Sequence, residues 1–254
     1  MMLFVKRDIV TVYKQTVLGP LWFFVQPLIT SVIFTLIFNN LAGIQTGAVP
    51  PFLFNLAGVS VWNYFKECLN TTSNTFVTNQ AIFSKVYFPR VIVPLSKVIS
   101  NLLKFGIQLL IFIAFYLYFV LNGFEVKPNQ ALVLFPFVVI TMALYGLGFG
   151  MILTSMTTKY RDLSLLVTFG VQLLMYVSAV MYPLSEVQER IPQYGWLIEY
   201  NPLAIVIESF RFMALGEGTF SILTLSVCLL VSLVLFLIGL VIFNRTEKNF
   251  IDTV

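Results

Sequence analysis

Long apolar runs, separated by shorter polar segments, dominate the hydropathy pattern of this chain. Uncharged apolar runs occupy residues 20–41, 105–121, 131–156, 163–182 and 221–243. Each is near the ~20 residues with which a helix crosses ~30 Å of hydrocarbon. The pattern predicts five membrane helices, over residues 20–41, 98–121, 131–156, 163–182 and 221–243.

A sixth helix is predicted over residues 51–78, but its two halves differ. It is apolar as far as Phe65 and then polar, beginning with Lys66 and Glu67 and continuing through Asn70. Polar groups at membrane depth are tolerated where they face protein or water. This helix therefore either ends early or lines a water-filled pathway, and we favour the pathway.

The distribution of Lys and Arg orients the six helices, because cytoplasmic loops carry an excess of basic residues. Six crossings put both termini on one side. The loops on the opposite side hold three basic residues, Lys127, Arg190 and Arg211. The loops on the side of the termini hold eleven: Lys6, Arg7, Lys14, Lys85, Arg90, Lys97, Lys104, Lys159, Arg161, Arg245 and Lys248. We therefore expect a multi-pass protein of the cell (inner or cytoplasmic) membrane with both termini cytoplasmic.

Two further segments accompany the membrane helices. Residues 3–17 place basic and apolar side chains toward different sides of a helix, which is typical of an amphipathic helix on the cytoplasmic membrane face. The alternative is a basic flank that only fixes topology. Residues 183–218 carry three prolines, and their apolar part is too short and too charged to span. We expect a re-entrant external hairpin there, and the alternative is a surface loop.

Composition agrees with a single transmembrane domain over residues 1–254. The chain is 59% apolar and 10% charged, with a mean hydropathy of +0.92, whereas soluble domains are roughly half apolar and about a quarter charged. We expect an all-α integral membrane protein with six transmembrane helices. The net charge of +4 lies at the edges of the apolar runs, and not on the water-facing patch of a nucleic-acid binder. We expect the lipid bilayer, and no nucleic acid, as a partner.

The sequence lacks the residues that several kinds of chemistry need. No glycine precedes a lysine, so there is no GxxxxGK[ST] loop to hold the phosphates of ATP. There is no histidine, and the two cysteines are far apart. Glu186 and Glu189 are closely spaced, but we interpret them as a solvated turn and not as ligands of a divalent cation. We expect no catalytic residue, no metal site and no cofactor bound by this chain.

A cytoplasmic segment keeps apolar residues where no lipid is expected. Residues 79–97, NQAIFSKVYFPRVIVPLSK, are too charged and too rich in proline to span the membrane. Exposed apolar side chains of this kind indicate a surface that binds a partner. The alternative is that they pack back onto the same chain or onto lipid headgroups. In the next cytoplasmic loop, Asp162 directly precedes a helix, whose free N–H groups it can cap.

Several motifs together resemble a known family of membrane proteins. They are LGPLWFFVQPL at residues 18–28, FSKVYFPRVIVPLSKV at 83–98, KYRDL at 159–163, and NPL at 201–203 followed by Glu208 and Arg211. Residues 4–243 resemble the membrane subunit of type-2 ABC exporters. Within that family the chain is most similar to the O-antigen and teichoic-acid polysaccharide permeases.

This resemblance implies a six-helix subunit that forms a dimer with a second copy of itself, so that twelve helices surround one pathway. It implies two ABC ATPase subunits, which use ATP and Mg and dock beneath the dimer. It implies a lipid-linked polysaccharide as the cargo, and the loop around residues 82–90 as the coupling helix that the ATPase pushes. The residues expected to couple to the ATPase are Ile82, Phe83, Lys85, Val86, Tyr87, Phe88, Pro89, Arg90, Tyr160 and Arg161.

Aromatic, amide and hydroxyl side chains suit a sugar polymer, because rings stack on the CH faces of sugars and polar groups bond their hydroxyls. Many of these residues can equally be interfacial anchors or packing residues. We expect Arg7 and Lys14 at the substrate entrance, where they would attract the pyrophosphate of a lipid-linked glycan. The candidate channel residues are Trp62, Tyr64, Asn70, Thr71, Asn74, Tyr145, Tyr176 and Tyr182.

Two other functions stay open at this point. The same architecture can carry a drug or a lipid instead of a glycan. A membrane enzyme of lipid-linked sugar metabolism is the second alternative, and it would act without any ATPase.

Overall fold

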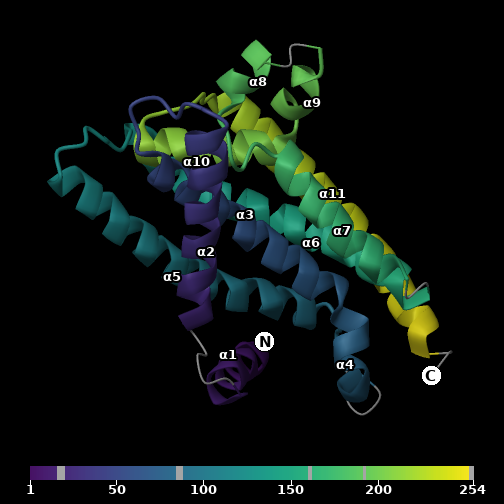
Figure 1. Cartoon of the computed structure of the whole chain (residues 1–254). Coiled ribbons are helices and arrows are strands. Elements are labelled where there is room, and N and C mark those ends of the chain that lie inside the picture. Colours follow the sequence, from purple (N-terminus) through teal and green to yellow (C-terminus); the bar gives the residue numbers. More distant parts are fainter. Residues whose placement is uncertain (16–20, 84–87, 160–161, 191–192, 252–254) are drawn as a thin grey trace.

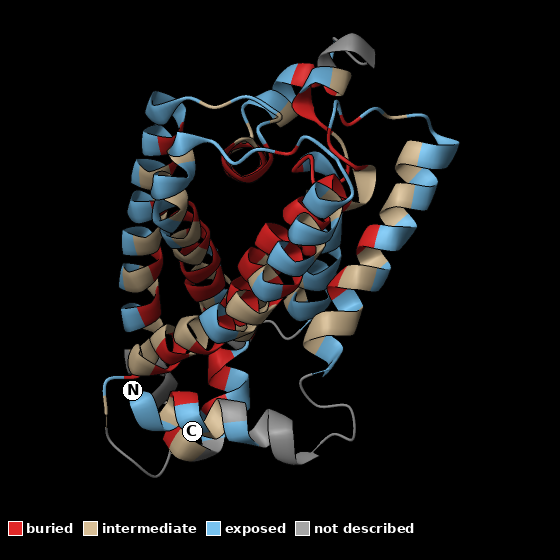
Figure 2. Ribbon diagram, turned by 90° about the vertical axis from the view of Figure 1, so that its left-hand side faces the viewer, coloured by how far each residue is buried: buried red, intermediate tan, exposed pale blue. Residues whose placement is uncertain are grey.

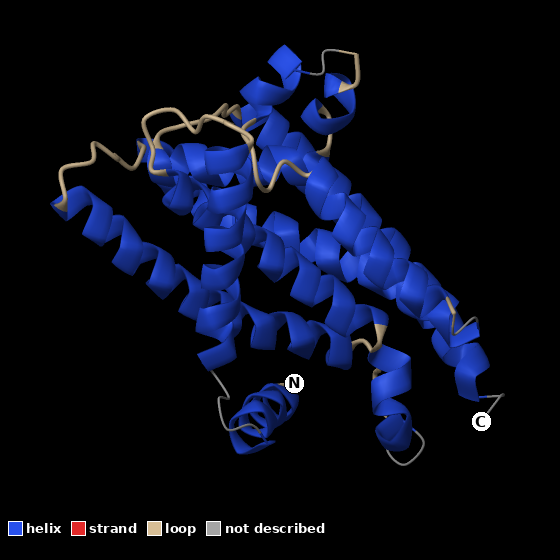
Figure 3. Cartoon of the chain, in the orientation of Figure 1, coloured by secondary structure: helices blue, strands red, loops and turns tan. Residues whose placement is uncertain are grey.

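The computed structural model of the chain describes residues 1–15, 21–83, 88–159, 162–190 and 193–251. These residues form helices and loops and contain no strand (Figure 3). A π-helical segment, η1 (Thr35–Leu41), continues α2, and a short 3-10 helix, η2 (Gln130–Leu134), leads into α6. The α-helices are α1 (Met2–Gln15), α2 (Leu21–Phe34), α3 (Pro51–Ser73), α4 (Thr75–Phe83), α5 (Ile92–Leu121), α6 (Phe135–Lys159), α7 (Leu163–Val177), α8 (Leu184–Arg190), α9 (Gly195–Glu199), α10 (Pro202–Leu215) and α11 (Ile222–Ile251).

The long helices run between two ends of the molecule. Figure 1 shows α1, α4 and the C-terminal end of α11 at one end, and α8, α9 and α10 at the other. Helices α2, α3, α5, α6, α7 and α11 connect these ends. The segments of the described chain that are long and apolar enough to cross a membrane are Leu21–Leu41, Ile92–Leu121, Gln130–Thr157 and Ile222–Glu247.

These spans confirm an all-helical, multi-pass membrane protein. Helix α7 is apolar but has only 15 residues, and α3 mixes polar residues among apolar ones. The count of six transmembrane helices therefore stays a prediction, as does the re-entrant nature of residues 183–218.

Helix α3 forms the centre of the bundle. Most of its side chains are buried, including Leu53, Phe54 and Trp62, and it contacts α2, α5, α6 and α10. Figure 2 shows buried residues on the sides of the helices that face one another. Pro50 and Pro51 start α3, since a proline at the first helical position lacks only an N–H that would be unpaired there. The structure ends the helix at Ser73 and kinks the chain at Asn74, with α4 following, where the sequence predicts one helix over 51–78.

Glycines let α6 approach its two neighbours closely. Gly146 and Gly150, four residues apart, face α3, and a Cβ at either would lie 2.5 Å from an α3 side chain. Gly148 faces α11, and a Cβ at Gly148 would lie 2.9 Å from the α11 backbone. In the same way, a Cβ at Gly239 of α11 would lie 2.6 Å from the Gly148 carbonyl oxygen. Small residues at such positions allow tight helix packing within a membrane, where no hydrophobic effect drives helices together.

The segment between α7 and α11 contains a capped helix, α10. Asn201 caps α10 by accepting a hydrogen bond from the backbone N–H of Leu203 (3.0 Å), and Pro202 occupies the first turn. Gly216 ends the helix in the left-handed conformation (φ 78°) that glycine adopts without strain. Most of α10 is buried against α3 and α6, so this part of the chain belongs to the packed core.

Candidate functional site

A polar cavity of about 370 Å³ lies between α2, α3 and α7. Its wall combines amide, hydroxyl and charged side chains from the middle of helices that are otherwise apolar. Such groups persist at membrane depth where they face a cavity or one another. The lining residues are Gln26, Thr30, Val59, Trp62, Asn63, Lys66, Glu67, Asn70, Thr168, Val171, Gln172 and Met175.

Helical spacing brings the polar groups of this cavity together. Gln26 and Thr30 lie four residues apart on α2, and Thr168 and Gln172 lie four apart on α7. Residues three, four or seven apart share one face of a helix, as Asn63, Lys66, Glu67 and Asn70 do on α3. Three faces of this kind converge on one space and offer several donors and acceptors to a hydroxyl-rich ligand.

The cavity contains two of the eight candidate channel residues, Trp62 and Asn70. Asn70 comes from the polar second half of the helix that the sequence singles out as the wall of a water-filled pathway, whereas Trp62 lies in its apolar first half. Lys66 and Glu67 in that polar half were also named from the sequence, but Asn63 and the polar lining residues of α2 and α7 were missed, although a signal was present: pairs of polar residues at helical spacing inside apolar runs. That signal identifies Gln26, Thr30, Thr168 and Gln172 as one group.

Three further candidate channel residues bond or pack within the chain. The Tyr64 ring is buried and stacks on Phe105 at 4.9 Å between centroids. The buried Tyr145 hydroxyl donates to the Cys228 carbonyl at 3.0 Å. Thr71 donates to the Glu67 carbonyl at 2.6 Å. These interactions agree with the alternative given in the sequence analysis, that such residues pack within the protein.

The remaining candidate channel residues lie at helix ends. Asn74 is exposed at the kink after α3 and donates to the Asn70 carbonyl at 2.9 Å. Tyr176 is about half exposed near the end of α7. The Tyr182 hydroxyl donates a hydrogen bond to the backbone carbonyl of Tyr176. None of these three borders the polar cavity.

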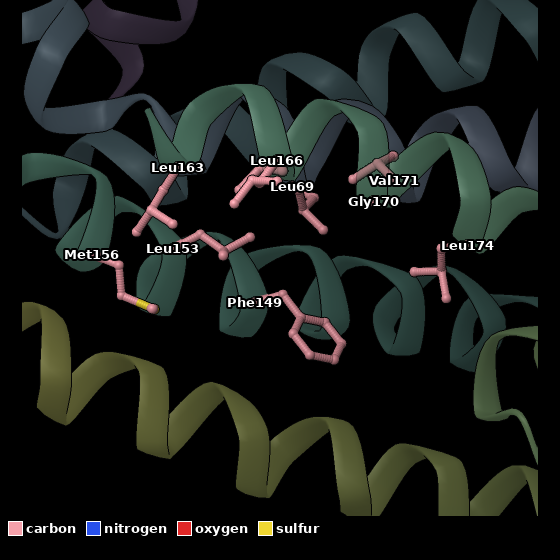
Figure 4. A pocket seen from close by; sticks show the side chains of 10 residues that line it. Leu69, Phe149, Leu153, Met156, Leu163, Leu166, Gly170, Val171 and Leu174 are labelled. Carbon is pink, nitrogen blue, oxygen red and sulfur yellow. The ribbon is translucent and has the colours of Figure 1, made fainter. Parts of the chain in front are cut away.

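An apolar groove of about 300 Å³ lies on the other side of α7, between it and α6 (Figure 4). Val171 lines both the groove and the polar cavity and is the one buried residue of α7. Helix α7 is thus a thin wall with an apolar and a polar side. The other labelled residues of the groove are Leu69, Phe149, Leu153, Met156, Leu163, Leu166, Gly170 and Leu174.

The segment expected to couple to an ATPase lies beside α1 and α11. Phe83 is buried in a cluster with Phe76 and Phe243, and the Arg90 guanidinium stands over the Phe83 ring at 5.2 Å. Arg90 also donates to the Glu247 carbonyl at 3.2 Å, and its Nε lies 3.8 Å from the Glu247 carboxylate. For Phe83 and Arg90 the structure therefore shows the alternative arrangement, packing onto the same chain.

The other residues of this segment are more accessible or fall outside the described chain. Ile82 and Phe88 are half-buried and Pro89 is exposed. The Phe88 ring also contacts Phe4 of α1, 5.6 Å away between centroids. The expected coupling residues that lie outside the described residues are Lys85, Val86, Tyr87, Tyr160 and Arg161.

The amphipathic helix expected over residues 3–17 is α1, and it is attached to the bundle by charge. The Asp8 carboxylate forms ion pairs with the Lys97 ammonium of α5, 2.8 Å away, and with the Arg7 guanidinium, 3.0 Å away. Arg7 also donates to Asn79 at 3.5 Å. The guanidinium expected at the substrate entrance thus has protein partners. The side chain of Lys14, the second candidate there, lies outside the described residues.

A buried ion pair lies at the end of the bundle that holds α10. Arg211 of α10 is fully buried and donates to the carbonyls of Ala179 and Val180 at 2.8 and 2.6 Å. Its guanidinium covers the Phe54 ring of α3 at 3.8 Å and lies 3.4 Å from the Glu208 carboxylate. This pair joins α10 to α3 and to the chain after α7. The helix predicted over 163–182 ends at Val177 in the structure, and two carbonyls beyond that end accept the Arg211 hydrogen bonds.

The described residues contain no group of three or more His, Cys, Asp or Glu side chains arranged to hold a metal ion. Cys68 and Cys228 are both buried and unpaired. The polar cavity offers hydrogen-bonding and charged side chains to a ligand.

Three relatives are similar to this chain along most of its length. Two are O-antigen export system permease proteins RfbA of Klebsiella pneumoniae, 28% and 27% identical over 97% of this chain and 91% of their own. An O-antigen export system permease protein RfbA of Myxococcus xanthus is 25% identical over 82% of this chain and 76% of its own. The sequence profile of the ABC-2 type transporter family matches residues 1–215. The chain therefore belongs to the ABC-2 type transporter family, as a membrane subunit of a transporter and not an enzyme.

Proposed function

We propose that this chain is the permease of an ATP-driven exporter that carries a lipid-linked, O-antigen-like polysaccharide from the cytoplasmic side outward. The three relatives are O-antigen export system permease proteins, which supports a polysaccharide cargo. The observation that carries the proposal is the polar cavity between α2, α3 and α7, since its amide and hydroxyl groups suit a sugar polymer.

The proposed assembly is a homodimer with two ABC ATPase subunits, which bind ATP and Mg. Helices α2, α3, α5, α6, α7 and α11 are its six transmembrane helices in each copy, in one domain over residues 1–254. Residues 183–218 form the re-entrant external segment. The end that holds α1 and α4 faces the cytoplasm, in agreement with the excess of basic residues in its loops.

A dimer would account for the many exposed side chains of α7 in a single copy of the chain. Leu165, Leu166 and Phe169 on this helix are each more than half exposed, and the polar cavity beside them is open. A second copy placed against α2 and α7 would close the cavity into a pathway between the two subunits. Trp62 and Asn70 then stand on the wall of that pathway.

The ATPase is proposed to act on the segment around residues 82–90 and on residues 160 and 161. Ile82, Phe88 and Pro89 are the described residues with accessible surface there, whereas Phe83 and Arg90 pack inside the chain. A docking test therefore substitutes Ile82→Glu and leaves Phe83 intact. Loss of ATPase copurification at unchanged thermal stability supports this docking surface, and full copurification of the variant rejects it.

A pair of matched variants tests the pathway itself. Thr168 of α7 and Thr224 of α11 are both exposed, and each hydroxyl donates to its own helix backbone, at 3.0 and 2.9 Å. Only Thr168 lines the polar cavity. In proteoliposomes with the ATPase, Thr168→Val should slow ATP-dependent glycan movement about fivefold, the effect of one hydrogen bond of about 1 kcal/mol. Thr224→Val should leave it unchanged, and equal rates for both variants would contradict the proposed pathway.

A further inference from the structure

Lys66 stands in the wall of the polar cavity without a partner of opposite charge. It is half-buried on α3 and lines the cavity. Within the described part of the chain its ammonium makes no ion pair and no side-chain hydrogen bond. Lys66 lies seven residues before the end of α3, which is about 10 Å of helix at ~1.5 Å per residue. It therefore sits in the half of the bundle nearer the proposed cytoplasmic end.

The neighbouring acidic group does not neutralise Lys66. Glu67 also lines the cavity, but its carboxylate lies 3.6 Å from the ammonium of Lys104 on α5. Lys104 in turn stands over the Phe23 ring of α2 at 5.3 Å. Of these three charges, Glu67 and Lys104 offset each other. The cavity wall keeps one positive charge in excess.

An uncompensated ammonium at membrane depth is costly unless water or an anion reaches it. The cavity offers both the access and further donors, because the amides of Asn63 and Asn70 precede and follow Lys66 by about one turn on the same helix face. An ammonium surrounded by amide donors is suited to the oxygens of a phosphate, which lysine binds as a point charge.

We infer that Lys66 is the binding point for the phosphate that links the transported glycan to its lipid. This inference rests on the proposed function. A phosphate is favoured over a carboxylate of the sugars, because a polyprenyl-linked glycan carries the linking phosphate whatever its sugars are. The position in the cytoplasmic half suits a headgroup that enters from that side. Arg7 forms an ion pair with Asp8 and a hydrogen bond with Asn79. In this proposal Arg7 therefore positions α1 and does not bind the phosphate.

The test compares two ligands on the full chain in lipid nanodiscs. One is a polyprenyl diphosphate carrying a short oligosaccharide, and the other is a neutral glycolipid with the same oligosaccharide and lipid but no phosphate. The variants are Lys66→Gln and the charge-keeping Lys66→Arg. Lys127→Gln serves as the control, since Lys127 is exposed at the external end. Thermal unfolding of each variant establishes that it folds.

Lys66→Gln should weaken binding of the diphosphate ligand about tenfold, as loss of one charge-assisted hydrogen bond implies. Its affinity for the neutral glycolipid should stay unchanged, and Lys66→Arg and Lys127→Gln should bind both ligands like wild type. Unchanged diphosphate binding by Lys66→Gln, or an equal loss for both ligands, overturns the role of Lys66 and leaves the exporter proposal standing. Failure of the wild type to bind the diphosphate ligand overturns both.

Discussion

Loss of the Arg211 guanidinium should destabilise the fold by about 3–5 kcal/mol, the cost of breaking a buried ion pair. Arg211 is fully buried, and its bonds to the carbonyls of Ala179 and Val180 are 2.8 and 2.6 Å long. In Arg211→Met the side chain still fills much of the space but donates no hydrogen bond. Two buried carbonyls then lose their donor and the Glu208 carboxylate loses its opposite charge. The chain after α7 loses its attachment to α10.

The pH dependence of this variant identifies the cause. Burial raises the pKa of the Glu208 carboxyl, and Arg211 opposes that rise, so removal of Arg211 raises the pKa further. A carboxyl with a higher pKa in the folded state binds a proton on folding. Its contribution to stability is present below the unfolded pKa and is lost as the pH rises through the folded pKa. Arg211→Met should therefore regain part of its stability toward about pH 5.

The assay is unfolding in detergent, followed by tryptophan fluorescence as heat or a denaturing detergent is applied. Adding Glu208→Gln to Arg211→Met removes the buried carboxyl, so the double variant should be more stable than the single one at neutral pH and should lose the pH dependence. If Arg211→Met unfolds within about 0.5 kcal/mol of wild type, as a surface substitution does, the ion pair does not hold this end of the bundle together.

Three further predictions follow from single contacts. Gly148→Ala should cost about 1–3 kcal/mol by overpacking α6 against the α11 backbone, whereas Gly106→Ala, with nothing within 4 Å, should not lower the thermal unfolding temperature; equal effects would contradict the close approach. Tyr145→Phe should cost about 1 kcal/mol in the same assay by removing the bond to α11, and an unchanged stability would contradict that bond. Lys97→Gln should speed hydrogen exchange in α1 about fivefold by breaking the ion pair with Asp8; unchanged exchange would show that other contacts hold α1.

The positions of the long helices could be predicted because each is encoded locally. Runs of apolar residues give their positions, and the change of composition after Phe65 marks the polar half of α3. The kink at Asn74 was less visible, because a single residue leaves the helical conformation between two helical segments. The close packing of α6 also has a local signature, the glycines at 146 and 150, which hydropathy alone overlooks.

The partners of charged residues depend on contacts between distant parts of the chain and could not be read in this way. Arg90 contacts Glu247 because α11 is long enough to place its C-terminal turns beside Phe83 and Arg90. Arg211 is buried because the chain folds back after α7 and Gly58 leaves room: a Cβ there would lie 2.3 Å from the guanidinium. The sequence shows the three-residue spacing of Glu208 and Arg211, but not that both lie in the core.

The most direct test of the central claim is glycan movement in proteoliposomes that contain this chain with and without its ATPase subunits. We predict that a labelled lipid-linked glycan crosses the membrane only when the ATPase, ATP and Mg are all present, and that the cargo moves away from the face that binds the ATPase. Equal movement without the ATPase would contradict the account and favour a carrier or an enzyme that acts alone.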